Sequence, residues 1–190
     1  MKQIIITSEQ IPSVYLQSIN ESDTSETYVQ WLNDPLINQY LETRFYQQNF
    51  QTVLEFIRNI MANPHEHLFT IRLKKNDRHI GNIKVGAINV HHNIGEVSLF
   101  IGDKNAWGKG IASQAIQLIS RYSLEQLQLR KLCAGAYKTN IGSTKAFLNS
   151  GYQHDGELVD HYTSNGQPIN LVQVCLFEYQ LNLLPAIDIT

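Results

Sequence analysis

The sequence predicts a mixed α/β or α+β fold in which helices cover a single sheet. Stretches rich in alternating or β-branched residues recur at 14–19, 68–74, 79–90 and 95–101, as strands do. Helical patterns lie between and after these stretches, and helices inserted between strands imply layers of helix on sheet. The segment 95–137 follows the pattern strand, helix, strand, which nearly always forms a right-handed parallel crossover.

Between the first strand and the next, the chain predicts two helices. Residues 21–26 are polar and supply caps for a helix that ends or kinks at Asn33-Asp34-Pro35, because the residue before proline is pushed out of the α region. A second helix, 51–61, carries an apolar stripe and ends at Asn63-Pro64.

The second half of the chain alternates strands and helices. Residues 68–101 predict a meander of strands, and an amphipathic helix begins near Ile111. A short buried strand follows at 131–137, and a short helix at 142–150. Asn165-Gly166 favours a type I′ hairpin, which adds the last two strands.

Length and composition favour one domain in a reducing compartment. The 190 residues are predicted to fill a single domain, 1–190, with 1–13 as an N-terminal extension. A net charge of −2 and 17% charged residues argue against a nucleic-acid partner. No apolar run approaches the ~18 residues of a membrane span, and the start of the chain lacks a signal-peptide core. With Cys133 and Cys175 expected as reduced, buried thiols, these features predict a cytoplasmic protein that does not bind membranes.

Histidines occur in two short groups, which we interpret as no metal site. His65-Glu66-His67 has no third ligand at a suitable spacing, and His91-His92 would point to opposite faces of a strand.

The segment 103–112 is the part of the sequence that most suggests chemistry. Gly108 and Gly110 form a turn that opens directly into a helix, whose first N–H groups lack internal partners and favour an anion. Lys104 and Lys109 are placed to add positive charge. Neither the dinucleotide nor the Walker A pattern is present. A phosphate site and a plain turn into a core helix both remain open from these residues alone.

The run WGKGIA resembles the acetyl-coenzyme A signature of the GNAT family of N-acetyltransferases. The upstream segment WLNDPLINQYLETRF and the downstream segment NIGSTKAFLNSGY are similar to the ribosomal-protein alanine acetyltransferase (RimJ/RimL-like) branch. The resemblance covers residues 14–181. It implies the GNAT fold: a mixed, mostly antiparallel sheet of about seven strands with splayed central parallel strands, flanked by about four helices. It also implies acetyl-CoA as the acetyl donor, an amine acceptor and, as one possibility, a homodimer.

The same resemblance implies where acetyl-CoA binds. Pantetheine would lie between the strands 96–101 and 132–137, and the diphosphate would accept hydrogen bonds from the backbone of the glycine turn. Asn140 matches the family asparagine near the sulfur, and Ser143 would face the same way one turn later. The expected coenzyme contacts are Phe100, Ile101, Trp107, Gly108, Lys109, Gly110, Ile111, Ala112, Ser113, Asn140, Ser143 and Phe147.

Three residues are expected to be catalytic: Glu96, Asn140 and Ser143. Glu96 is the candidate base, on the strand beside the acyl site. The alternative is that Glu96 forms an ordinary ion pair with a basic neighbour or caps a loop. Phe147 stands where many members of the family have a tyrosine that protonates the leaving thiolate. Since a phenyl ring cannot donate a proton, the Ser143 hydroxyl or a water is the candidate donor.

Four residues are expected to line the acceptor site. Tyr40, Glu42 and Arg44 lie between the two early helices, and His161 lies near the terminal hairpin. Two classes of acceptor stay open: a protein N-terminus, as the resemblance to the RimJ/RimL-like branch implies, or a small amine such as an amino sugar, a polyamine or an aminoglycoside. A different class of function, a non-catalytic acyl-CoA sensor, also stays open because the tyrosine is missing.

Overall fold

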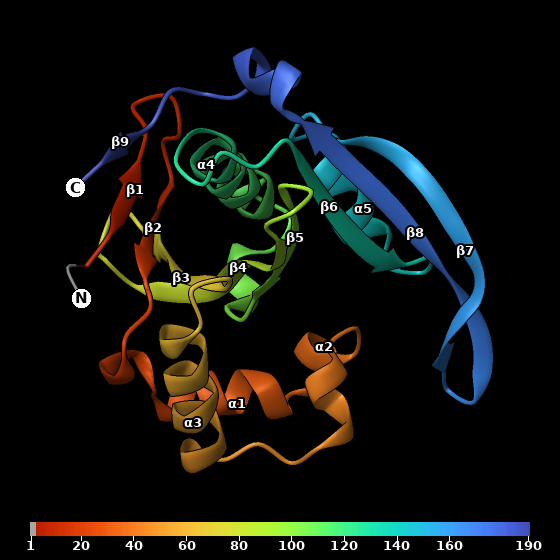
Figure 1. The fold of residues 1–190 in the computed structure, drawn as a ribbon. Helices are drawn as coiled ribbons and strands as arrows, with labels where there is room; N and C mark the ends of the chain where they lie inside the picture. Colours follow the sequence, from red (N-terminus) through yellow and green to blue (C-terminus); the bar gives the residue numbers. More distant parts are fainter. Residues whose placement is uncertain (1–2) are drawn as a thin grey trace.

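The computed structural model describes residues 3–190 as one sheet covered by helices (Figure 1), which confirms the predicted fold class. The strands follow the order β7-β8-β6-β5-β4-β3-β2-β1-β9. They are β1 (Ile5–Thr7), β2 (Val14–Ser18), β3 (His67–Leu73), β4 (His79–Asn89), β5 (Ile94–Ile101), β6 (Lys131–Tyr137), β7 (Gln153–Ser164), β8 (Gln167–Phe177) and β9 (Asp188–Ile189).

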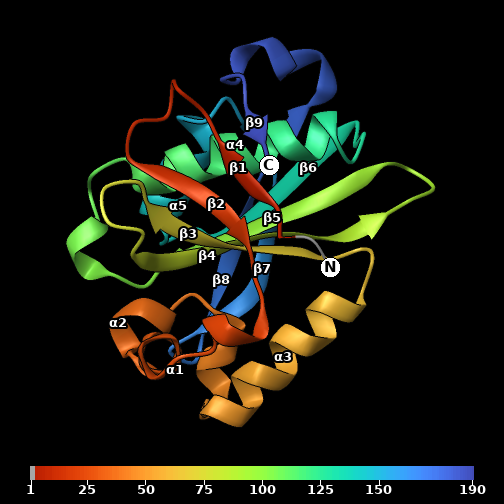
Figure 2. The same cartoon turned by 90° about the vertical axis from the view of Figure 1, so that its left-hand side faces the viewer.

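Helices lie on both faces of the sheet (Figures 1 and 2). The α-helices are α1 (Glu26–Asn33), α2 (Pro35–Asn38), α3 (Phe50–Ala62), α4 (Ile111–Glu125) and α5 (Ile141–Leu148). Short 3₁₀ turns are η1 (Glu21–Asp23), η2 (Glu42–Phe45), η3 (Lys104–Ala106) and η4 (Glu178–Leu183). None of the helices within residues 3–190 is long and apolar enough to cross a membrane.

The sheet has nine strands, two more than the approximate number expected. The segment predicted as an N-terminal extension supplies one of them, because β1 pairs with β2 (Ile5 opposite Gln17) and with β9 (Ile6 opposite Ile189). Ile6 is fully buried in the core. Strands of two or three residues are held by such pairing and burial rather than by any local pattern. Residues 1 and 2 of the expected extension lie outside the described range.

Two apolar clusters hold the layers together. The larger lies under α4, where Ile116, Leu118 and Ile119 are fully buried against the sheet. The smaller lies on the opposite face and joins α1 and α3 to β3, with Trp31 and Ile57 among its members. Each helix therefore buries an apolar stripe against one side of the strands.

α1 ends before Pro35, as the sequence predicted, and the same residues also begin α2. Asp34 is extended (ψ 117°) before proline, so α1 ends there. The Asp34 side chain then accepts a hydrogen bond from the Leu36 N–H, and Pro35 occupies the first position of α2. The sequence that stops one helix thus starts a short second one.

The parallel strands β5 and β6 separate after three paired positions. Ile94, Gly95 and Glu96 lie opposite Lys131, Leu132 and Cys133, and no pairing follows. Beyond this point β5 stays bonded to β4, and β6 stays bonded to β8 through Tyr137. Figure 1 shows the arm formed by β6, β7 and β8 turning away from the rest of the sheet. The predicted splayed pair is therefore present.

Both cysteines are free, as predicted, although they face each other across β6 and β8. Cys175 is buried and Cys133 is half-buried. Burial and the neighbouring Asp155 raise the pKa of the Cys175 thiol to about 11, which keeps it protonated at neutral pH.

Close packing at Gly102 gives a test of the smaller core. A Cβ at this position would lie 2.0 Å from the Trp31 ring, so we expect Gly102→Ala to lower the free energy of unfolding by about 2 kcal/mol. Urea denaturation measures the change. Gly142→Ala is the control, because its Cβ meets nothing within 4 Å in α5 and the free energy should not fall. Equal destabilisation by the two variants would contradict this packing.

Candidate active site

The glycine turn leaves the first turn of α4 open. Gly108 and Gly110 both have φ +71°, a left-handed conformation that glycine adopts without strain, and a Cβ on either would meet nothing within 4 Å. Gly110 caps α4 without a side-chain hydrogen bond, and the first bond inside the helix runs from the Gln114 N–H to the Gly110 carbonyl. The preceding N–H groups are left for a ligand, which fits a coenzyme diphosphate.

Of the two lysines expected to add positive charge at this turn, one is engaged elsewhere. Lys109 is exposed beside the open N–H groups, whereas the Lys104 Nζ lies 2.6 Å from the Asp34 carboxylate. Lys104 is therefore engaged in an ion pair, and the expected extra charge at the turn comes from Lys109. Trp107 donates its indole N–H to the Ile101 carbonyl (2.8 Å) and so ties the turn to the end of β5. The Ser113 hydroxyl donates to Ala146 and joins α4 to α5.

The gap between β5 and β6 presents free backbone edges. From Val97 onward β5 has a hydrogen-bonded neighbour on its β4 side only, and from Ala134 onward β6 has one on its β8 side only. The unpaired N–H and C=O groups along both edges suit an extended chain that carries amides, as pantetheine does. The gap and the open turn of α4 together fit the coenzyme expected here.

Asn140 lies at the end of this gap, where it begins α5. Its side-chain oxygen accepts the Ser143 N–H (3.2 Å), which fixes the amide at the helix start. Within residues 3–190 the Asn140 amide nitrogen and the Ser143 hydroxyl make no side-chain hydrogen bond, so both remain available to a ligand.

Phe147 does not line the gap, contrary to the expected coenzyme contact. Its ring is 2% exposed and packs edge-on against Tyr152, with ring centres 5.0 Å apart. Tyr152 is itself buried, and its hydroxyl shares a hydrogen bond with Ser120 (2.9 Å). The ring therefore belongs to the core between α5 and α4 and offers no surface to a coenzyme.

Glu96 lies at the last paired position of β5, opposite Cys133, where the strands part. Its side chain is exposed and makes no ion pair within the described part of the chain. Strand alternation puts it on the side of Phe100, which packs against Tyr28 and belongs to the smaller core. The carboxylate thus faces the side of α1 and α2, and the alternative of an ordinary ion pair is not what the structure shows.

The expected acceptor residues Tyr40, Glu42 and Arg44 meet around the hydroxyl of Tyr137. Arg44 Nη2 donates to this hydroxyl (2.7 Å), which donates to the Glu42 carboxylate (2.8 Å). The Tyr40 ring lies 5.8 Å from the Tyr137 ring, and its hydroxyl donates to the Thr139 carbonyl (3.3 Å). Burial and the adjacent Glu42 raise the pKa of Tyr137, whereas Arg44 opposes the shift.

Sequence reasoning missed Tyr137, whereas Tyr162 adjoins the expected acceptor residue His161. The Tyr162 ring stacks on Tyr137 (centres 5.0 Å apart), and His161 lies edge-on to Tyr162 at 4.7 Å. Alternation along β6 does put Tyr137 on the same face as Cys133, but a pairing between positions 42 and 137 has no local signal. We call Tyr40, Glu42, Arg44, Tyr137, Tyr162 and His161 the acceptor cluster.

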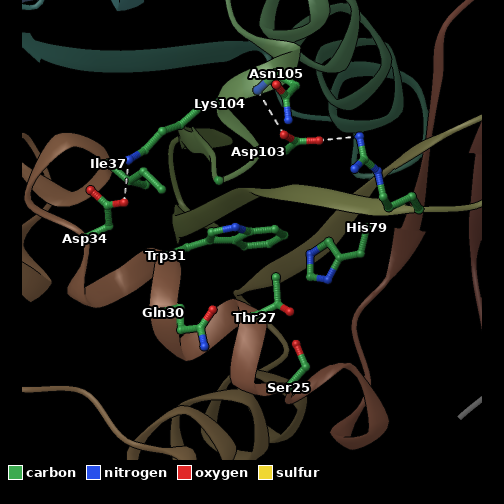
Figure 3. Close-up of a pocket in the computed structure, with 12 residues that line it drawn as sticks. Ser25, Thr27, Gln30, Trp31, Asp34, Ile37, His79, Asp103, Lys104 and Asn105 are labelled. Carbon is green, nitrogen blue, oxygen red and sulfur yellow. Dashed lines mark hydrogen bonds and ion pairs between the residues drawn. The ribbon is translucent and has the colours of Figure 1, made fainter.

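A separate hollow of about 670 Å³ lies beside α1 (Figure 3), and Lys104 is the one residue of the expected phosphate turn among those that line it. It is bounded by Trp31 and His79 and crossed by two ion pairs, Asp34–Lys104 and Arg78–Asp103. Burial lowers the pKa of His79, whose ring bonds Asn82. The candidate catalytic residues lie instead along the gap between β5 and β6. Within residues 3–190 no cluster of three or more His, Cys, Asp or Glu side chains could hold a metal ion.

Fold and site together define a class of protein that binds a coenzyme at a helix start and holds its acyl end between two diverging strands. Residues 13–153 match the family model described as "Acetyltransferase (GNAT) domain". The chain therefore belongs to the GNAT acetyltransferases, and it is an acetyl-CoA-dependent N-acetyltransferase that acts on a primary amine.

Similar proteins carry related descriptions. An uncharacterized N-acetyltransferase p20 from Bacillus licheniformis is 24% identical over 160 residues, 83% of this chain and 89% of that protein. The spermidine N(1)-acetyltransferase of Escherichia coli K12 is 30% identical over 100 residues, 53% of each chain. The structure of a spermidine N-acetyltransferase from Vibrio cholerae with CoA and spermine shares the fold, with TM-score 0.79 and 20% identity over 89% of this chain and 98% of that one.

The open glycine turn predicts a selective loss of coenzyme binding in Gly110→Ala. The methyl group strains φ +71° and points into the space left for the diphosphate, so the dissociation constant for acetyl-CoA should rise about tenfold. Calorimetry measures it. Gly166→Ala is a matched control, because Gly166 has φ +75° in the distant β7–β8 turn and should lose stability without losing affinity. Equal affinities for the two variants would remove the turn from the binding site.

Proposed function

We propose that the acceptor amine enters between the acceptor cluster and the gap, and that Glu96 accepts its proton. The observation that supports this is the exposed, unpaired Glu96 carboxylate at the point where β5 and β6 separate. A base must lie within reach of the reacting nitrogen, directly or through one water. Glu96 lies on the same side of the sheet as the smaller core, toward α1 and α2, from which η2 continues the chain.

The proposed reaction is a direct transfer. The acceptor ammonium gives one proton to Glu96, the freed nitrogen attacks the thioester carbonyl carbon, and an amide bond forms as the carbon–sulfur bond breaks. The departing thiolate takes a proton from the Ser143 hydroxyl or from a water, and the second proton of the attacking nitrogen restores that hydroxyl or water. The Asn140 amide nitrogen, on the same first turn of α5, is placed to hold the pantetheine arm near the sulfur. Oriented groups of this kind lower the barrier mainly by positioning.

We propose a protein or peptide N-terminus as the leading acceptor, of the kind used by the RimJ/RimL-like branch. The two sequence segments that flank the glycine turn support it. A small amine is the second candidate, supported by the spermidine acetyltransferases among the similar proteins. A cytoplasmic location and a homodimer remain predictions.

The non-catalytic acyl-CoA sensor that the sequence left open gives way to the enzyme, because the family model and the N-acetyltransferase relatives match this chain. A thiol-release assay with saturating acetyl-CoA, against a panel of peptides and small amines, tests the acceptor. Release of CoA that depends on a peptide N-terminus supports the leading candidate. Release with small amines alone would favour the second candidate.

Glu96→Gln tests the base. The amide keeps the shape of the side chain but cannot accept the proton, so kcat should fall about a hundredfold at neutral pH. The affinity for acetyl-CoA, measured by calorimetry, should stay unchanged. Ser98→Ala, on the same face of β5, is the control and should retain its turnover. Full turnover in Glu96→Gln would exclude this carboxylate as the base.

Ser143→Ala tests the proton donor. If its hydroxyl protonates the thiolate, kcat should fall about tenfold, which is less than the ~10²–10⁴-fold that a general acid typically contributes, because a thiolate is a good leaving group. Thr144→Val, the next residue of α5, is the control. An unchanged kcat in Ser143→Ala would assign the proton to water.

A further inference from the structure

Glu42 is an exposed carboxylate of the acceptor cluster, and its charge is already balanced inside the protein. Its Oε1 accepts the Tyr137 hydroxyl at 2.8 Å and lies 3.4 Å from Arg44 Nη1. We infer that this pairing selects acceptor amines with one positive charge, carried on a ring or other apolar body, over polyamines. The inference rests on the proposed function and concerns the substrate class of that same site.

Arg44 is held in place and does not swing freely. Its guanidinium lies over the Phe45 ring (4.2 Å) and near the Tyr137 ring (5.1 Å), and Nη1 donates to the Leu41 carbonyl (2.9 Å). The Arg44 side chain is only 16% exposed, against 64% for Glu42. Stacking and hydrogen bonds therefore keep the positive charge beside Glu42 whether or not an acceptor is bound.

A polyamine needs carboxylates that are free to hold its distant ammonium groups. A carboxylate that already faces a guanidinium attracts a second cation weakly, and the guanidinium repels it. Two further carboxylates on the β6–β8 arm are also paired, Asp155 with Lys131 (2.6 Å) and Glu157 with Lys138 (2.7 Å). The negative charge that would attract a second or third ammonium group is thus largely cancelled around the acceptor cluster and along the β6–β8 arm.

Two exposed carboxylates near the gap make no ion pair within residues 3–190. Glu96 is assigned to the reacting amine itself, which leaves it no capacity for a distant ammonium. Asp160 lies beside His161 on β7. Substituting Asp160 separates its contribution to the attraction of polyamines from that of Glu42.

The walls of the cluster favour an apolar acceptor body. Tyr162 and Tyr40 are partly exposed and flank Tyr137, and the exposed His161 ring lies edge-on to Tyr162. Aromatic faces bury a ring or an aliphatic body with favourable dispersion, and they do so without requiring further charge. An amine attached to such a body can give its proton to Glu96, the single available base, while the body packs against these aromatic rings.

The test compares spermidine with 2-phenylethylamine by thiol release with saturating acetyl-CoA. For the unmodified protein, kcat/KM should be at least about fivefold higher for 2-phenylethylamine. Arg44→Gln frees the Glu42 carboxylate, so the ratio of spermidine to 2-phenylethylamine should rise about fivefold, the size of one exposed ion pair. Adding Glu42→Gln in the same chain should return the ratio to its starting value.

The double variant separates charge from loop damage. If Arg44→Gln only loosened η2, the ratio would not return when Glu42 is also changed. Arg58→Gln is the matched control, because it frees Glu21 from an exposed ion pair between α3 and η1, outside the cluster and the β6–β8 arm, and should leave the ratio unchanged. The rise caused by Arg44→Gln should persist in a chain that also carries Asp160→Asn, because it depends on Glu42.

The outcomes distinguish the inference from the function on which it rests. Preference for spermidine by the unmodified protein, or a ratio unmoved by Arg44→Gln, would overturn the inference and leave acetyl transfer intact. No thiol release with either amine, while calorimetry still shows acetyl-CoA binding, would overturn both.

Discussion

The separation of β5 from β6 after Glu96 and Cys133 is the constraint on which the rest of the structure depends. Each strand gives up pairing along one edge, and an unpaired backbone group costs about 1–3 kcal/mol when water is excluded from it. A sheet tolerates this loss only where a ligand or solvent supplies the missing bonds. The gap is therefore both the weakest part of the sheet and the part best prepared for an extended, amide-bearing coenzyme.

The width of the gap is fixed from both faces of the sheet. On one face, the Ser113 and Ser150 hydroxyls join α4 to α5, because the first donates to Ala146 and the second to Ser113. On the other face, Arg44 and Tyr137 join η2 to the end of β6. These contacts hold the β6–β8 arm to the rest of the sheet where strand pairing no longer does. The separation of β5 from β6 thereby positions both the coenzyme side and the acceptor side of the gap.

Local patterns in the sequence predicted the element order and the glycine turn, because helix periodicity, proline stops and left-handed glycines act over a few residues. They did not predict β1 and β9, whose two or three residues are ordered by edge pairing. They also missed the contact of Tyr137 with Glu42 and the burial of Phe147. Both depend on which elements the fold brings together, and that information lies in tertiary packing rather than in spacing.

The burial of Phe147 bears on which proton transfer matters most. A hydroxyl in its place would need a partner in a region where Tyr152 already uses Ser120, and an unsatisfied one is costly to bury. The proposed reaction tolerates the absence of a hydroxyl at position 147. A thiol has a pKa of about 8.5, so a thiolate departs readily near neutral pH. The attacking amine is mostly protonated there, since the pKa is about 7.7–8.0 for a peptide α-amino group and about 10.4 for an alkyl amine. Removing a proton from the amine is the harder task, and it is the one we propose for the exposed Glu96.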